Sequence, residues 1–208
     1  CVKQIRWENV TGISKSWRDI DMKTMLCLRP NATCPCENFM ETLYESRWLG
    51  LYREGHWEFA QRPNASACVG ILAITEQNEI LLVEQFRIPV EARVIEIPAG
   101  LVGDEIEHRD ESLAATAARE LHEETGYRAG KIEPLLASPT SAGMVRETTH
   151  LFHATELRPD GPGGGIGSED ITVHRVPLDQ LRPWLRDREA SGLMIDFKIH
   201  AALWAAGK

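Results

Sequence analysis

The stretch that decides the fold is Arg119-Glu-Leu-His-Glu-Glu-Thr-Gly126, which ends the one strongly helical segment of the chain. Asp110 or Ser112 can cap the start of this helix, and Gly126 is a typical stop signal. An apolar stripe recurs at the spacing of a helix face. It consists of Leu113, Ala114, Ala117, Ala118 and Leu121. The small alanines predict close packing against a neighbouring layer.

Three carboxylates gather at the end of this predicted helix. Glu120 and Glu124 are one turn apart on one face, and Glu123 lies at its border. Like charges at this spacing destabilise a helix by a few tenths of a kcal/mol, and bound cations remove that penalty. The pattern therefore predicts a platform for Mg²⁺, with Mn²⁺ as the alternative metal. On these residues alone, a solvated acidic surface remains the other interpretation.

Composition limits the kinds of partner. The 208 residues are 43% hydrophobic, and 23 Lys+Arg against 31 Asp+Glu give a net charge of −8. A polyanion would be repelled by this surface unless a metal or local cations intervened, so we expect neither nucleic acid nor a membrane as partner. No apolar run approaches the roughly 20 residues that span a bilayer. We expect a soluble, cytoplasmic protein whose five cysteines are reduced thiols.

The rest of the chain predicts strands with few helices between them. Residues 1–40 have no clear period and are expected to form an N-terminal arm. Residues 41–66 predict a β-hairpin, with strands Thr42–Tyr52 and His56–Arg62, and residues 67–208 form the expected catalytic domain. Further strands are predicted at Ala67–Thr75, Ile80–Gln85, Val94–Ile97, Ile132–Ala137, His150–Glu156 and Ile171–Pro177, and closing helices at Leu178–Arg188 and Ile195–Ala206. This order favours an α+β sandwich over a doubly wound sheet.

In its context, the acidic helix resembles the signature box of the Nudix hydrolases. Glu111 lies eight positions before Arg119, and the block from Arg119 to Tyr127 follows the family pattern. The family's opening glycine normally lies six positions before the first Glu, whereas Gly100 lies eleven positions before Glu111. We interpret the difference as an insertion of five residues, eleven minus six, in a surface loop within Leu101–Asp110. The resemblance implies an α/β/α sandwich with a mixed sheet and a loop-helix-loop motif.

The resemblance also implies roles for the residues of the box. It assigns metal ligation to the Ala99 carbonyl, Glu120, Glu123 and Glu124. Arg119 would pair with Glu123 one turn on and hold its carboxylate, so that both contribute to catalysis; an ordinary surface ion pair is the alternative. Glu111 would either support the loop or favour the helix N-terminus. The implied reaction is metal-assisted hydrolysis at phosphorus without a covalent intermediate.

Motifs outside the box resemble the ADP-ribose and ADP-sugar pyrophosphatase branch of the family. These are Trp57-Glu-Phe-Ala-Gln-Arg62, Leu82-Val-Glu-Gln-Phe-Arg87, Glu96-Ile-Pro-Ala-Gly100 and Ser138-Pro139. Trp57 matches an aromatic that stacks on adenine, and Arg62 and Arg87 match cations near the nucleotide phosphates. Glu96 is a fourth predicted substrate-binding residue. Trp57 could instead be a core aromatic, and Arg62 could pair with a neighbouring carboxylate.

A Glu on an acidic loop serves as the general base in this branch, which makes Glu169, after the flexible glycine-rich segment 161–167, the candidate here; Glu147 is its rival. Relatives of this kind are homodimers in which N-terminal strands complete the partner's pocket, a role open to residues 41–62. The expected activity is Mg²⁺-dependent cleavage of ADP-ribose to AMP and ribose 5-phosphate. The alternatives are cleavage of GDP-mannose or another nucleoside diphosphate sugar, and a non-catalytic domain that senses a nucleotide.

Overall fold

The computed structural model describes residues 40–167 and 170–208. The predicted arm therefore lies outside the described residues apart from Met40, and the candidate base Glu169 lies outside them as well. Residues from Glu41 to Lys208 form one compact unit. Its elements are β1 (Glu41–Glu45), β2 (Gly50–Glu54), β3 (Trp57–Gln61), β4 (Ala67–Ile74), β5 (Glu79–Arg87), η1 (Ile88–Val90), β6 (Ala92–Glu96), β7 (Ala99–Val102), η2 (Ile106–His108), α2 (Leu113–Thr125), β8 (Tyr127–Pro139), β9 (Thr148–Pro159), β10 (Thr172–Pro177), α3 (Leu181–Ala190), β11 (Met194–Ile195) and α4 (Phe197–Ala205).

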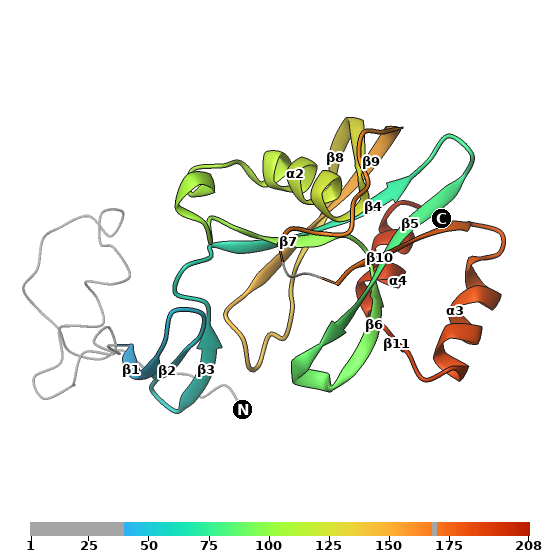
Figure 1. Ribbon diagram of the computed structural model, residues 1–208. Coiled ribbons are helices and arrows are strands. Elements are labelled where there is room, and N and C mark those ends of the chain that lie inside the picture. The colour runs from blue at the N-terminus through green and yellow to red at the C-terminus, as the bar shows by residue number, and fades with distance from the viewer. Residues whose placement is uncertain (1–39, 168–169) are drawn as a thin grey trace, which may run out of the picture. The chain divides into compact units, whose positions relative to one another are not determined.

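The larger sheet is mixed, as expected from the sequence. Its strands run in the order β11-β6-β5-β4-β9-β8, with β10 paired to β5 and β7 paired to β4 (Figure 1). The pairs β4–β9 and β6–β11 are parallel, whereas β5 is antiparallel to its neighbours β4, β6 and β10. Because β7 joins the long strand β4, the chain just before α2 is fixed to the centre of the sheet.

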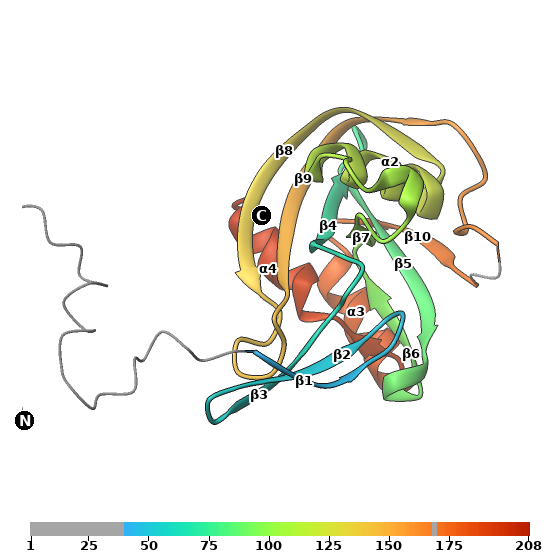
Figure 2. The same cartoon turned by 90° about the vertical axis from the view of Figure 1, so that its left-hand side faces the viewer.

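Helices cover both faces of this sheet, which confirms the α/β/α sandwich. Side chains alternate along β4: Leu72 and Ile74 pack with α3 and α4, whereas Val69 and Ile71 pack with α2. Figure 2 shows α2 on one side of the strands and α4 on the other. Ile71 and Leu72 are fully buried, and truncating such a side chain to alanine costs about 2–5 kcal/mol.

The N-terminal part forms a three-stranded antiparallel sheet in the order β1-β2-β3, not a simple two-stranded hairpin. The predicted β2–β3 hairpin is present, but the expected strand Thr42–Tyr52 is two strands separated by a turn. The Ser46 amide donates to the Leu49 carbonyl at 2.9 Å, and the Leu49 amide donates to the Ser46 hydroxyl at 3.2 Å. The turn is closed by a serine side chain and contains neither glycine nor proline. The sequence therefore has no strong turn signal between the two strands.

Other boundaries differ because of pairing and capping. The strands β8 and β9 are longer than predicted because they pair with each other along their whole length, from the Tyr127–Pro159 pair to the Pro139–Thr148 pair. On α2, Ala114 and Ala118 are exposed, so only part of the predicted apolar stripe packs inward. The last helix begins after Asp196, whose side chain caps it. Among the described residues, no helix is long and apolar enough to cross a membrane.

Candidate active site

The helix α2 has the ends that its sequence predicts. Ser112, rather than the alternative Asp110, is the N-cap, and its hydroxyl accepts a hydrogen bond from the Ala115 amide at 3.2 Å. Gly126 adopts a left-handed backbone with φ of 74°, and its amide donates to the His122 carbonyl at 2.8 Å. Such a C-cap strongly favours glycine. Because both ends of α2 are capped, the carboxylates of Glu120, Glu123 and Glu124 lie at defined positions near its C-terminal end.

Two of these carboxylates lie directly against the backbone of β7. The Ala99 amide donates to Glu124 Oε2 at 3.0 Å. At Gly100, an added Cβ atom would lie 2.0 Å from Glu120 Cδ and 2.1 Å from Glu120 Oε1. Glu120 therefore occupies the space that a side chain at position 100 would need, which is a physical reason for glycine there. Ala99 thus contacts Glu124, and Gly100 contacts Glu120.

Arg119 ties the acidic groups together. Its guanidinium reaches Glu123 at 2.7 Å, Glu120 at 3.0 Å and Glu111 at 3.2 Å. The expected pairing with Glu123 is confirmed, and its partners are only 15–22% exposed, which is less than in an ordinary surface pair. Glu111 also accepts from the Thr116 hydroxyl at 3.1 Å, so it supports Arg119 at the start of the helix.

Negative charge exceeds positive charge in this cluster. Four carboxylates, those of Glu111, Glu120, Glu123 and Glu124, face one guanidinium. Burial raises the pKa of Glu120 to about 7, the Arg119 guanidinium lowers it, and Glu123 raises it. A divalent cation held by oxygen ligands would remove this excess charge. The carboxylate seated over Gly100 and the acidic set around it therefore fit a divalent cation.

The inserted loop ahead of α2 holds a second acidic group. Glu105, Glu107 and His108 each offer a ligand atom, and these atoms lie within 4.8 Å of one another around η2. Both glutamates are exposed, and groups of this kind are common on protein surfaces. This group is therefore an acidic surface of the loop.

Two predicted substrate-binding residues form one ion pair. Arg87, at the end of β5, reaches Glu96 Oε2 through Nη2 at 2.7 Å and through Nε at 2.8 Å. Glu96 ends β6 and its side chain is only 7% exposed, whereas Arg87 is 42% exposed. Burial raises the pKa of Glu96, and the Arg87 guanidinium acts in the opposite direction. The buried carboxylate holds an arginine whose outer edge stays accessible.

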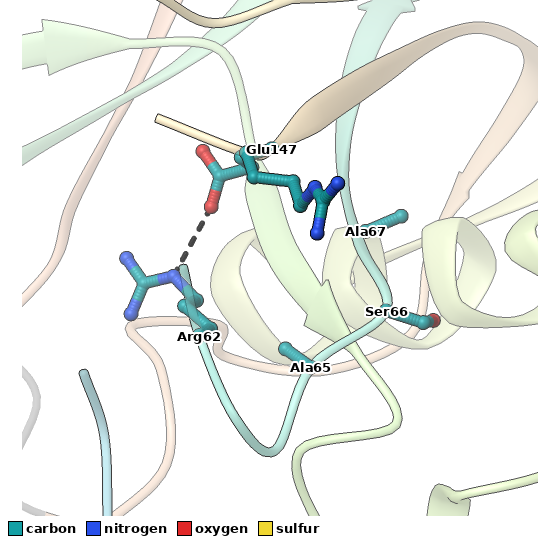
Figure 3. Close-up of a pocket in the computed structure, with 6 residues that line it drawn as sticks. Arg62, Ala65, Ser66, Ala67 and Glu147 are labelled. Carbon is teal, nitrogen blue, oxygen red and sulfur yellow. Dashed lines mark hydrogen bonds and ion pairs between the residues drawn. The ribbon is translucent and has the colours of Figure 1, made fainter. Parts of the chain in front are cut away.

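Arg62 pairs with Glu147, the rival base candidate, at 3.1 Å (Figure 3). The contact arises because β3 runs beside residues 144–146, with hydrogen bonds in both directions between the two segments. The Thr140 hydroxyl donates to the other oxygen of Glu147 at 3.0 Å. A recess lies here, lined by Arg62, Ala65, Ser66, Ala67, Arg146 and Glu147.

The thiol of Cys68, on β4, interacts electrostatically with both Glu147 and Glu120. The pKa of this thiol is raised to about 11, chiefly by burial; Glu147 and Glu120 also act to raise it, whereas Lys198 and Arg62 act to lower it. Cys68 pairs with Leu101 of β7 on one side and with Thr149 of β9 on the other, so the strand that Glu120 contacts and the strand that follows Glu147 lie on either side of β4.

Trp57 lies at the opposite end of β3 from Arg62. It pairs with Glu54 beside the hairpin turn, is 55% exposed and contacts the His56 ring at a centroid distance of 5.6 Å. The alternative of a core aromatic is therefore wrong. Five residues of extended chain span roughly 16 Å, so Trp57 and Arg62 would meet different parts of a ligand. A role in stacking on adenine stays a prediction.

The glycine-rich segment docks onto the end of α2. The amides of Gly164 and Gly165 donate to the Glu124 and Glu123 carbonyls at 2.8 and 3.0 Å. A Cβ atom on Gly163 would lie 2.4 Å from the Thr125 carbonyl carbon. This part of the segment is anchored to the acidic helix, contrary to the expectation of a wholly flexible loop, because glycines alone allow so close an approach.

Sequence reasoning missed the anchor on the other side of Glu169. Arg93, on β6, reaches Asp170 at 3.1 Å and Glu84 at 2.5 Å. Arg93 and its two acidic partners, Glu84 and Asp170, lie in three segments that are separate in the chain, and no local pattern signals their pairing. Gly164 and Gly165 thus contact α2, and Asp170 contacts β6.

Comparisons with known proteins agree with this architecture. The family model of the NUDIX domain matches residues 65–196. Because this is more than half of the chain, the protein belongs to the Nudix family. A solved structure described as the crystal structure of ADP compounds hydrolase shares the fold, with a TM-score of 0.63 and 19% sequence identity, over 81% of this chain and 89% of that chain.

Curated relatives have several activities. The chain is 43% identical over 129 residues to the ADP-ribose pyrophosphatase of Bacillus subtilis (strain 168), covering 56% of this chain and 64% of the relative. It is 33% identical to the methanol dehydrogenase activator of Bacillus methanolicus, covering 63% and 67%. It is 33% identical to the GDP-mannose pyrophosphatase of Pectobacterium atrosepticum, covering 61% and 67%. The alignments thus span about two thirds of each relative's length.

Proposed function

We propose that this Nudix protein hydrolyses the pyrophosphate bond of a nucleoside diphosphate sugar, with ADP-ribose cleaved to AMP and ribose 5-phosphate. The observation that carries the proposal is the seating of Glu120 and Glu124 against Gly100 and Ala99 of β7. Relatives named ADP-ribose pyrophosphatase, GDP-mannose pyrophosphatase and ADP-sugar pyrophosphatase support the substrate class.

Mg²⁺ is the proposed cofactor, with Mn²⁺ as the alternative, and the Ala99 carbonyl, Glu120, Glu123 and Glu124 are its proposed ligands. When bound, it would neutralise phosphate charge and lower the pKa of a water molecule for attack. Within the chain, the Ala99 amide donates to one oxygen of Glu124 and holds this carboxylate against β7. Arg119 holds Glu123 and Glu120 in place, which keeps two acidic side chains from moving apart.

The substrate is held by residues on the other side of the site. The exposed part of the Arg87 guanidinium is suited to bind phosphate oxygens, and its ion pair with the buried Glu96 carboxylate orients it. Arg62 is proposed to bind the nucleotide from β3, and Trp57 to stack on its base. Glu169 remains the proposed general base that takes the proton of the attacking water. Glu147 is less suited to that role, because Arg62 and Thr140 occupy both of its oxygens.

A homodimer is the proposed assembly. Five large apolar side chains of the three-stranded sheet and its turn are exposed, which is unusual for a surface that stays free in solution. They are Tyr44, Trp48, Leu49, Leu51 and Trp57. Light scattering should give twice the chain mass for the wild type and the single chain mass for Leu51→Glu. Trp204→Glu changes an exposed aromatic on α4 instead and should leave the dimer intact.

Substrate choice is tested by turnover. ADP-ribose, ADP-glucose and GDP-mannose are supplied in parallel with Mg²⁺, and the released nucleoside monophosphate is quantified. Fastest cleavage of ADP-ribose supports the proposal. Faster cleavage of GDP-mannose would move the protein to another substrate within the same class. Binding of nucleotide without cleavage of any diphosphate would replace the enzyme by a nucleotide sensor.

A further inference from the structure

Four charged side chains form a cluster of two ion pairs where β6 and β11 end. Arg87 pairs with Glu96, and Lys198 pairs with Asp196. The side chains of Glu96, Asp196 and Lys198 are 7%, 11% and 16% exposed, so water screens them poorly. Two positive charges balance two negative charges in this cluster.

The backbone holds the second pair beside the first. β11 pairs with β6 in parallel, so that Ile195 lies opposite Ile95. The Asp196 amide then donates to the Ile95 carbonyl at 2.9 Å, next to Glu96. Asp196 also accepts a hydrogen bond from the Lys198 amide at 2.7 Å, as the N-cap of α4. These bonds hold the backbone of Asp196 beside β6, next to Glu96.

The two pairs interact electrostatically. Burial raises the pKa of Glu96, the charges of Arg87 and Lys198 lower it, and Asp196 raises it. Lys198 also acts on Cys68, which lies in the region of Glu120 and Glu147. Lys198 therefore contributes to the electrostatics of both Glu96 and Cys68.

Stability of α4 does not explain a lysine at this position. Lys198 lies in the first turn of the helix, two residues after the N-cap. The N-terminal end of a helix dipole favours negative charge, so a cation there destabilises the helix. Asp196 caps the helix through its carboxylate without needing the ammonium. The lysine is thus placed where it serves the cluster and not the helix.

We propose that Lys198 is a positioning residue, whose charge balances Glu96 and Asp196 so that Arg87 remains available to bind the diphosphate of the substrate. This role rests on the proposed function. Without the ammonium group, two poorly screened carboxylates face the single guanidinium of Arg87. Arg87 is then held more strongly by the protein and binds phosphate oxygens less strongly.

The test removes charges singly and in pairs. Lys198→Met leaves an excess negative charge, whereas Asp196→Asn with Lys198→Met restores neutrality. Calorimetry measures the affinity for inorganic pyrophosphate in the presence of Mg²⁺, and steady-state kinetics with ADP-ribose give KM and kcat. We expect Lys198→Met to weaken pyrophosphate binding and raise KM about tenfold, with kcat nearly unchanged. The double variant and Lys198→Arg should both recover to within about threefold of the wild type.

Matched backgrounds separate this role from a structural one. In an Arg87→Met background, Lys198→Met should have no further effect on pyrophosphate affinity. The proposal is overturned if Lys198→Met binds pyrophosphate like the wild type, or if the double variant binds as weakly as Lys198→Met. If the affinity pattern holds but the wild type cleaves no nucleoside diphosphate sugar, the positioning role stands and the proposed function fails. If cleavage occurs without the affinity pattern, only the positioning role fails.

Discussion

Replacing Gly100 by alanine should separate the metal site from the stability of the fold. The new Cβ atom would lie 2.0 Å from Glu120 Cδ and 2.4 Å from Glu120 Cγ, far inside van der Waals contact. These atoms belong to the end of a flexible side chain, so the fold can relieve the clash by rotating Glu120 away from β7. The same rotation removes a proposed metal ligand.

The expected effect is therefore large on activity and small on stability. A displacement of a catalytic group by an ångström or more costs on the order of 100-fold in rate. The assay is AMP release from ADP-ribose as a function of Mg²⁺ concentration, with the melting temperature measured in parallel. Gly100→Ala should lower the rate at a given Mg²⁺ concentration about 100-fold and shift the melting temperature by only a few degrees.

Gly143 is the matched control. A Cβ atom there meets nothing within 4 Å, so Gly143→Ala should leave both the rate and the melting temperature unchanged. If the rate of Gly100→Ala depended on Mg²⁺ concentration as the wild-type rate does, Glu120 could be displaced without loss of activity. That result would rule out its proposed role as a metal ligand. An equal loss in the Gly143 variant would show that the assay responds to substitutions in general.

Three further outcomes follow from the geometry and the charges. Because burial raises the pKa of Glu120 from 4.5 to about 7, the stability that this group contributes to the metal-free protein is full below pH 4.5 and is lost as the pH rises through 7. Saturating Mg²⁺, which competes with that proton, should raise the melting temperature more at pH 8 than at pH 5, and Glu120→Gln should abolish the difference. Gly163→Ala should destabilise the protein more than Gly167→Ala. Both glycines have positive φ, but only at Gly163 would a Cβ atom meet backbone, 2.4 Å from the carbonyl carbon of Thr125. Equal melting temperatures of the two variants would contradict the docking of this segment on α2. Burial raises the pKa of the Cys68 thiol to about 11, so its alkylation by iodoacetamide, followed by mass spectrometry, should be slow at pH 8 and accelerate towards pH 11; rapid alkylation at pH 8 would contradict the described burial.

Local signals in the sequence were sufficient for the acidic helix. Ser112 and Gly126 are caps whose chemistry depends on neighbouring residues only, and both hold in the structure. The pairing of Arg119 with Glu123 follows from helix geometry and holds as well. The resemblance to the Nudix box then gave the fold, because the spacing of these same residues is what the family shares.

Features that depend on distant pairing could not be predicted in this way. The strand Ala99–Val102 forms because it pairs with β4, so Leu101 and Val102 belong to this strand and not to the surface loop expected within Leu101–Asp110. The turn at Ser46 is closed by one side chain and has no glycine or proline within it. The position of Lys198 beside Glu96 depends on the parallel pairing of β11 with β6, which no local pattern indicates.

The central claim is that the face of α2 carrying Glu120 and Glu124 performs metal-dependent hydrolysis. It is tested most directly by Mg²⁺-dependent AMP release from ADP-ribose by the wild type, by Glu124→Gln, and by Glu133→Gln, which alters an exposed glutamate of β8. The account predicts that Glu124→Gln lowers the rate by about 100-fold or more while remaining folded, and that Glu133→Gln matches the wild type. Wild-type rates in Glu124→Gln would contradict it.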